Sequence, residues 1–157
     1  GADYFLSIHR NAANKAGSAS GNEIWVVRKA NEKTQYKASV ILASLCKTDS
    51  LKNRGVKLGA PSYDNFGVNS GTTMASALLE VGFINNEKDN KVFDEKFDEI
   101  ALAIAKGFFY SRKVCNTNHS FRTTNINRIQ IIYSLSVFWS VTYNNAIFVS
   151  VFSVSSS

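Results

Sequence analysis

Short apolar runs mark three segments in the first two thirds of the chain. They are YFLSIH, EIWVV and SALLEVGFI, at residues 4–9, 23–27 and 76–84. Each run is shorter than a typical helix and contains β-branched or aromatic residues, so each predicts a β-strand. Trp25, in the second run, is expected to lie in the core.

Two longer segments, residues 31–47 and 89–110, have apolar side chains every three or four residues. This spacing predicts two helices, each with one apolar stripe. Asn31 is expected to cap the first helix. Asn86, with Asp89 three residues later, resembles a capping box and is expected to begin the second helix.

The segments between these elements have the composition of loops. Residues 10–22 are rich in Asn, Ala, Ser and Gly, and residues 58–73 contain the only proline of the chain. Gly55 is expected at the stop or turn after the first helix. Strands and helices in this order predict an α/β fold, with an open, largely parallel twisted sheet flanked by helices.

Residues 115–157 differ in character from the rest of the chain. They contain no Asp or Glu, and their only positive charges are Arg122 and Arg128. Three interpretations stay open: a transmembrane helix, a set of strands, or a segment that was never selected as protein, such as a frameshifted read. The many Ser, Asn and β-branched residues favour strands over a membrane helix. We therefore expect a division into residues 1–114 and an atypical tail at 115–157.

Composition and charge narrow the class of protein. With 157 residues, 45% of them hydrophobic and 19% charged, the chain fits one globular domain. The net charge of +6 suits a polyanionic partner, either a nucleic acid or an anionic cell wall. The two cysteines, Cys46 and Cys115, give neither a disulfide framework nor a CxxC metal site.

Candidate chemistry lies at the ends of two predicted strands. Glu80 interrupts an apolar run. Burying an ionised carboxylate is costly, so such a group is normally paired, metal-bound, protonated or in a cleft. The alternative is that Glu80 lies on the solvated face of a strand. His9 ends the first strand. Ligands of open α/β sheets bind outside the carboxyl ends of the strands, so both side chains are expected at one edge. An imidazole can bind zinc and a carboxylate can serve as a general base.

Arg54 is a candidate for guiding an anionic polymer, as are Arg10 and Lys57, although such residues are more often simply solvated.

The amino-acid sequences of these segments resemble those of one protein family. GADYFLSIHRNA and SALLEVGFINNEKD, with GNEIWV and KNRGVK between them in the right order, resemble the zinc-dependent N-acetylmuramoyl-L-alanine amidases of autolysins and phage endolysins. The resemblance runs from residue 1 to about residue 110. It makes residues 1–114 the C-terminal portion of an amidase catalytic domain.

The resemblance implies a reaction and two site residues. The family hydrolyses the amide between N-acetylmuramic acid and L-alanine in peptidoglycan, with Zn²⁺ as cofactor. It implies that His9 is a zinc ligand and that Glu80 is the catalytic carboxylate. Peptidoglycan is then the expected partner, without nucleic acid or stable membrane insertion. The expected place of action is the cell wall or the extracellular space.

One departure from the family limits this expectation. The other two zinc ligands of the family, a His and a Glu, lie before the ADYFLSIH strand, and this chain begins just before that strand. His119 in the tail is a poor substitute. The alternative is therefore a catalytically incomplete fragment that at most binds wall material. A basic nucleic-acid binder is a third, weaker hypothesis.

Overall fold

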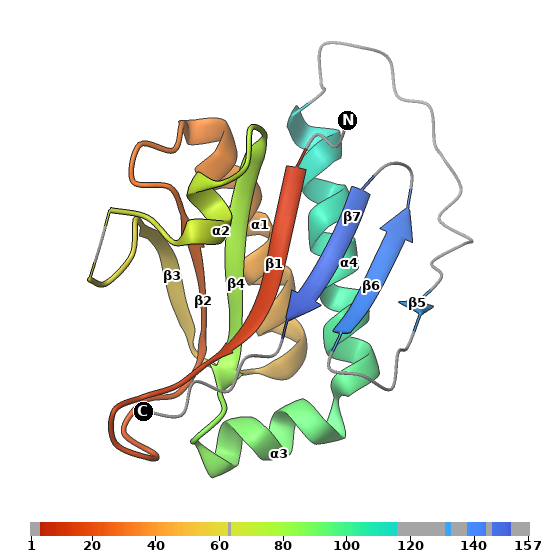
Figure 1. Ribbon diagram of the computed structural model, residues 1–157. Helices are drawn as coiled ribbons and strands as arrows, with labels where there is room; N and C mark the ends of the chain where they lie inside the picture. The colour runs from red at the N-terminus through yellow and green to blue at the C-terminus, as the bar shows by residue number, and fades with distance from the viewer. Residues whose placement is uncertain (1–3, 63, 116–130, 133–137, 144–145, 152–157) are drawn as a thin grey trace.

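The computed structural model describes residues 4–62, 64–115, 131–132, 138–143 and 146–151. Its strands form one open sheet in the order β3-β2-β4-β1-β7-β6-β5 (Figure 1). The strands are β1 (Tyr4–Asn11), β2 (Asn22–Val26), β3 (Asn53–Leu58), β4 (Ala75–Phe83), β5 (Ile131–Ile132), β6 (Phe138–Tyr143) and β7 (Ala146–Val151).

Four helices accompany the sheet. They are α1 (Glu32–Asp49), α2 (Gly67–Ser70), α3 (Glu87–Glu95) and α4 (Phe97–Cys115). Helices α1 and α4 lie side by side behind the sheet as Figure 1 shows it, while α2 lies in front of it. The main core forms where the apolar stripes of α1 and α4 meet the sheet, which satisfies the burial that their periodicity predicted.

Both predicted helix starts are confirmed. The Asn31 side chain accepts a hydrogen bond from the Thr34 amide at the start of α1. The Asn86 side chain accepts hydrogen bonds from the amides of Lys88 and Asp89 at the start of α3. Each asparagine therefore satisfies amide groups that the first turn of a helix leaves without partners.

The predicted fold class is confirmed, and the sheet is mixed. Strand β1 is parallel to β4, and β2 is parallel to β3. Strand β2 runs antiparallel to β4, between the two pairs. The carboxyl ends of β1 and β4 therefore meet at one edge, which is the edge that the candidate residues require.

Three local predictions are wrong. Gly55 does not stop a helix but lies inside β3, with a positive φ of 88°. The segment predicted as one long helix is two helices, because α3 ends at Lys96, which has a non-helical backbone. Phe93 and Phe97, on either side of this break, pack edge to face at 5.4 Å, so the apolar spacing continues across it. The loop at residues 58–73 also contains the short helix α2.

The tail contributes strands where the structure describes it. Strand β7 pairs with β1 in parallel and with β6 in an antiparallel hairpin, so the strand interpretation is confirmed for these residues. Among the described helices, none combines the length and the apolar character that crossing a membrane requires. His119 lies outside the described residues, and the division of the chain at residue 114 stays a prediction.

Candidate functional site

The two faces of the sheet have different surroundings. Leu6 and Ile8 of β1, Ile24 of β2, and Leu79 and Val81 of β4 point into the core beneath α1 and α4. Because side chains alternate along a strand, the residues between them lie on the opposite face. His9 and Glu80 alternate with these core residues and lie on that opposite face, which we call the polar face.

His9 and Glu80 are neighbours on the polar face. They are register partners in the parallel pair β1·β4, so their side chains leave adjacent strands on the same side of the sheet. The structure thus brings together the two residues that sequence reasoning selected. The predicted role of each stays a prediction.

Glu80 lies in surroundings that disfavour its charge. Burial, and secondarily the charge of Glu23, raise the pKa of Glu80 to about 8. Glu23 is its register partner on the other side, in the antiparallel pair β2·β4. The Oε2 atom of Glu80 is buried and has no hydrogen-bond partner among the described residues. A carboxyl group with a pKa near neutrality can accept a proton and return it, which is the property of a general acid–base catalyst.

His9 is half-buried beside it. Its Nε2 atom lies 2.8 Å from the hydroxyl oxygen of Ser7, two residues earlier on the same face. Burial lowers the pKa of His9, so the ring favours the neutral form. Neutral imidazole is the form that binds metal ions, and the Ser7 contact engages Nε2 and not Nδ1.

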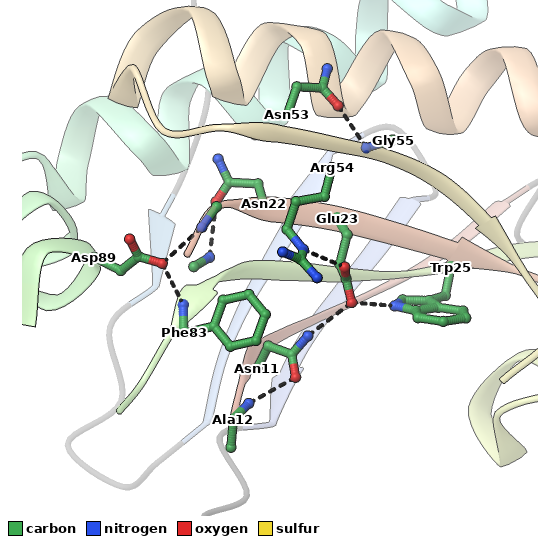
Figure 2. A network of polar contacts seen from close by, with 12 residues as sticks. Asn11, Ala12, Asn22, Glu23, Trp25, Asn53, Arg54, Gly55, Phe83 and Asp89 are labelled. Carbon is green, nitrogen blue, oxygen red and sulfur yellow. Dashed lines mark hydrogen bonds and ion pairs between the residues drawn. The ribbon is translucent and has the colours of Figure 1, made fainter. Parts of the chain in front are cut away.

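Sequence reasoning missed a second acidic residue, Glu23, which organises the polar face (Figure 2). Its Oε1 atom accepts hydrogen bonds from Asn11 Nδ2 at 2.8 Å and from Trp25 Nε1 at 3.0 Å. Its Oε2 atom accepts one from Arg54 Nε at 2.7 Å. Strict alternation in the run EIWVV was the available signal, since it places Glu23 and Trp25 on one face and Ile24 on the other.

The expectation that Trp25 lies in the core is therefore wrong. Its side chain is half-buried on the polar face. Its ring packs edge to face against Phe66 at 5.4 Å, just before α2. The side-chain amide of Asn69, within α2, donates to the Trp25 carbonyl oxygen. Helix α2 and the loop before it therefore cover one part of the polar face and leave the carboxyl ends of β1 and β4 to the candidate site.

Buried polar contacts fix these strand ends. Asp89, fully buried at the start of α3, accepts hydrogen bonds from the amides of Gly21 and Phe83. Arg10 donates to the carbonyl oxygen of Val81 and to Asn90 Oδ1, and its guanidinium lies over an aromatic ring. Arg10 thus holds β1 against β4 and α3, which is a structural role.

The described residues do not form a complete metal site. Within them, no three His, Cys, Asp or Glu side chains come close enough together to hold a metal ion. His9 is the one imidazole at this position, and a structural or catalytic zinc ion needs at least three protein ligands. The donor set that the structure describes therefore fits zinc only as a part of a larger site.

Comparison with known proteins agrees with this geometry. The family described as N-acetylmuramoyl-L-alanine amidase matches residues 1–109. The chain is 34% identical over 107 residues to the N-acetylmuramoyl-L-alanine amidase CwlM of Bacillus licheniformis, covering 68% of this chain and 38% of CwlM.

Two solved structures are also similar. The catalytic domain of CwlV, an N-acetylmuramoyl-L-alanine amidase from Bacillus (Paenibacillus) polymyxa var. colistinus, matches with a TM-score of 0.59 and 31% identity, over 71% of this chain and 59% of that one. An N-acetylmuramoyl-L-alanine amidase from Clostridium difficile 630 matches with a TM-score of 0.61 and 26% identity, over 71% and 58%. The chain thus spans less than two thirds of the length of these proteins.

Proposed function

Because the chain belongs to the N-acetylmuramoyl-L-alanine amidase family, we propose that its domain hydrolyses the amide between N-acetylmuramic acid and L-alanine in peptidoglycan. Within that reaction, Glu80 is the catalytic carboxylate. The observation that carries this proposal is the placement of Glu80, half-shielded on the polar face beside His9, with a buried oxygen that no described residue satisfies.

Glu80 acts as a proton carrier in this proposal. Its carboxylate takes a proton from the attacking water, and the resulting acid gives that proton to the leaving nitrogen of L-alanine. A pKa of about 8 suits both steps, because the group exchanges a proton readily near neutral pH. Neighbouring Glu23 contributes by keeping negative charge close to Glu80.

His9 is proposed as one zinc ligand. When bound, zinc polarises the scissile carbonyl group and lowers the pKa of water. The remaining ligands come from outside the described residues, since those residues contain no three-ligand group. The Ser7 hydroxyl, 2.8 Å from His9 Nε2, orients the imidazole ring.

The place of action that we propose is the cell wall or the extracellular space, where peptidoglycan is found. An autolysin or an endolysin fits this role, and the net charge of +6 favours contact with an anionic wall.

The test uses the complete domain, including the zinc ligands that lie outside the described residues. Release of free L-alanine amino groups from purified peptidoglycan should fall about 10²–10⁴-fold in Glu80→Gln, because the amide keeps the shape of the side chain and cannot carry the proton. The matched control is Glu99→Gln, at an exposed position on α4, which should keep full activity. Full activity in Glu80→Gln would remove Glu80 from the mechanism.

A second candidate function is a catalytically incomplete chain that at most binds wall material. The single imidazole at the candidate site favours it. Metal analysis of the purified 157-residue chain separates the two possibilities. About one tightly bound zinc ion per chain would contradict this second candidate, and a chain without zinc that still sediments with peptidoglycan would support it.

A further inference from the structure

Four charged or polar side chains form a row across the polar face. His9 lies on β1, Glu80 on β4, Glu23 on β2 and Arg54 on β3, and these strands are neighbours in that order. His9 and Glu80 are used by the proposed reaction. Arg54, at the far end of the row, has no part in it.

One irregularity in the sheet brings Arg54 to this face. From Asn22 to Ile24, β2 advances two residues while β3 advances three, from Asn53 to Val56, so β3 contains one extra residue. The extra residue lies at Gly55, whose φ of 88° suits glycine. As a result, Arg54 reaches Glu23 on the polar face while Val56 still packs against the core.

A similar shift occurs on β4. Between His9 and Asn11, β1 advances two residues while β4 advances three, from Glu80 to Phe83. The Arg54 guanidinium carbon lies 5.0 Å from the centre of the Phe83 ring (Figure 2). The guanidinium is therefore held on one side by a buried carboxylate and on another by an aromatic ring.

This arrangement leaves donors available. Only the Nε group of Arg54 has a hydrogen-bond partner among the described residues, which is Glu23 Oε2. The side chain of Arg54 is 31% exposed, and that of Glu23 is 5% exposed. The two terminal nitrogens thus remain for a ligand, in the planar geometry that binds a carboxylate through two hydrogen bonds.

Resting on the proposed function, we propose that Arg54 forms a subsite for a free carboxylate on the peptide side of the scissile amide. Neighbouring strands lie about 4.8 Å apart, so β3 and β4 are separated by about 10 Å. An extended peptide covers about 3.4 Å per residue. A peptide whose first nitrogen lies at Glu80 therefore brings a carboxylate of about its second or third residue to Arg54.

The test measures binding by the whole chain and does not need hydrolysis. Two synthetic muramoyl dipeptides serve as probes, one with a free carboxylate on its second residue and the other with a carboxamide at that position. Trp25 reports binding through its fluorescence, because its indole donates to the same Glu23 that holds Arg54. The chain has 2 tryptophans, so a Trp139→Phe background leaves Trp25 as the only one.

The chain is expected to bind the carboxylate probe about tenfold more tightly than the carboxamide probe, the contribution of charge-assisted hydrogen bonds. Arg54→Gln should abolish that preference and keep the affinity for the carboxamide. The matched control is Arg28→Gln, which removes an exposed arginine paired with Asp64 elsewhere and should keep the preference.

Equal affinities for the two probes, no binding of either probe, or an unchanged preference in Arg54→Gln would each overturn the subsite. The comparison of the two probes needs only the Trp139→Phe background and not Arg54→Gln, so a folding defect in Arg54→Gln does not remove the test. If the complete domain prefers the carboxylate probe but does not hydrolyse peptidoglycan, the proposed function is contradicted and the subsite is not. If the complete domain hydrolyses both probes and binds them equally tightly, the subsite is contradicted and the proposed function is not.

Discussion

On β4, Leu79 and Glu80 are neighbours in sequence but lie on opposite faces of the sheet. Leu79 is fully buried beneath the helices, as part of the apolar core. Glu80 faces a surface on which charged and polar side chains hold one another, from Asn11 to Arg54. One face supplies the free energy of folding through apolar burial, while the other presents groups whose pKa and hydrogen bonding suit chemistry.

The polar face depends on the core beneath it. No group among the described residues hydrogen-bonds the buried Oε2 of Glu80, which is unfavourable by itself. A strand whose other side is packed in the apolar core can tolerate that cost, because its position is fixed by burial.

The largest effect is expected on the core face. Leu79→Ala should lower the free energy of unfolding by about 2–5 kcal/mol, because it removes a fully buried side chain and leaves a cavity. Urea unfolding followed by circular dichroism measures this. Leu102→Ala, on α4, is the matched control, since Leu102 is 37% exposed and should cost less than about 1 kcal/mol. Equal losses in the two variants would contradict the division of the two faces.

Sequence reasoning predicted the core face well, because its signals are periodic. The three- and four-residue spacing in α1 specifies the buried face of that helix, and the short apolar runs in β1 and β4 identify these segments as strands. Glu80 stood out for the same reason, as the one charge in an apolar run. His9 was found because it ends a strand.

The remainder of the polar face could not be predicted in this way. Alternation counts residues, and the extra residue at Gly55 reverses the count, so Arg54 changes face. The position of β2 between β3 and β4 also decides that Glu23 and Glu80 are neighbours, and strand order depends on tertiary packing. The break at Lys96 was hidden because the apolar spacing continues across it.

The next effect is a pH dependence that belongs to the polar face. The pKa of Glu80 is raised from 4.5 to about 8 in the folded chain, so the folded state binds its proton more tightly than the unfolded state. The stabilisation is complete below pH 4.5 and is lost as the pH rises through about 8. Partial exposure of the side chain reduces the effect to about 1–3 kcal/mol.

Urea unfolding of the metal-free chain at pH 5 and at pH 8 measures this dependence. Most of the change in stability lies between these two pH values. Glu80→Gln should remove it, because the amide does not titrate. If Glu80→Gln loses as much stability between these pH values as the unmodified chain, then Glu80 is not the titrating group. That result would also weaken its assignment as a proton carrier.

The smallest effect is expected at Gly55. A Cβ atom there would meet nothing within 4 Å, so Gly55→Ala should cost only the backbone strain of a positive φ, about 1–2 kcal/mol. Gly17→Ala is the matched control, because Gly17 also has a positive φ, 73°, and open space around its Cβ position. The two variants should lose similar stability. Only Gly55→Ala should weaken the preference for the carboxylate probe, because only Gly55 forms the bulge that turns Arg54 to the polar face. An unchanged preference in Gly55→Ala would show that Arg54 reaches that face without the bulge.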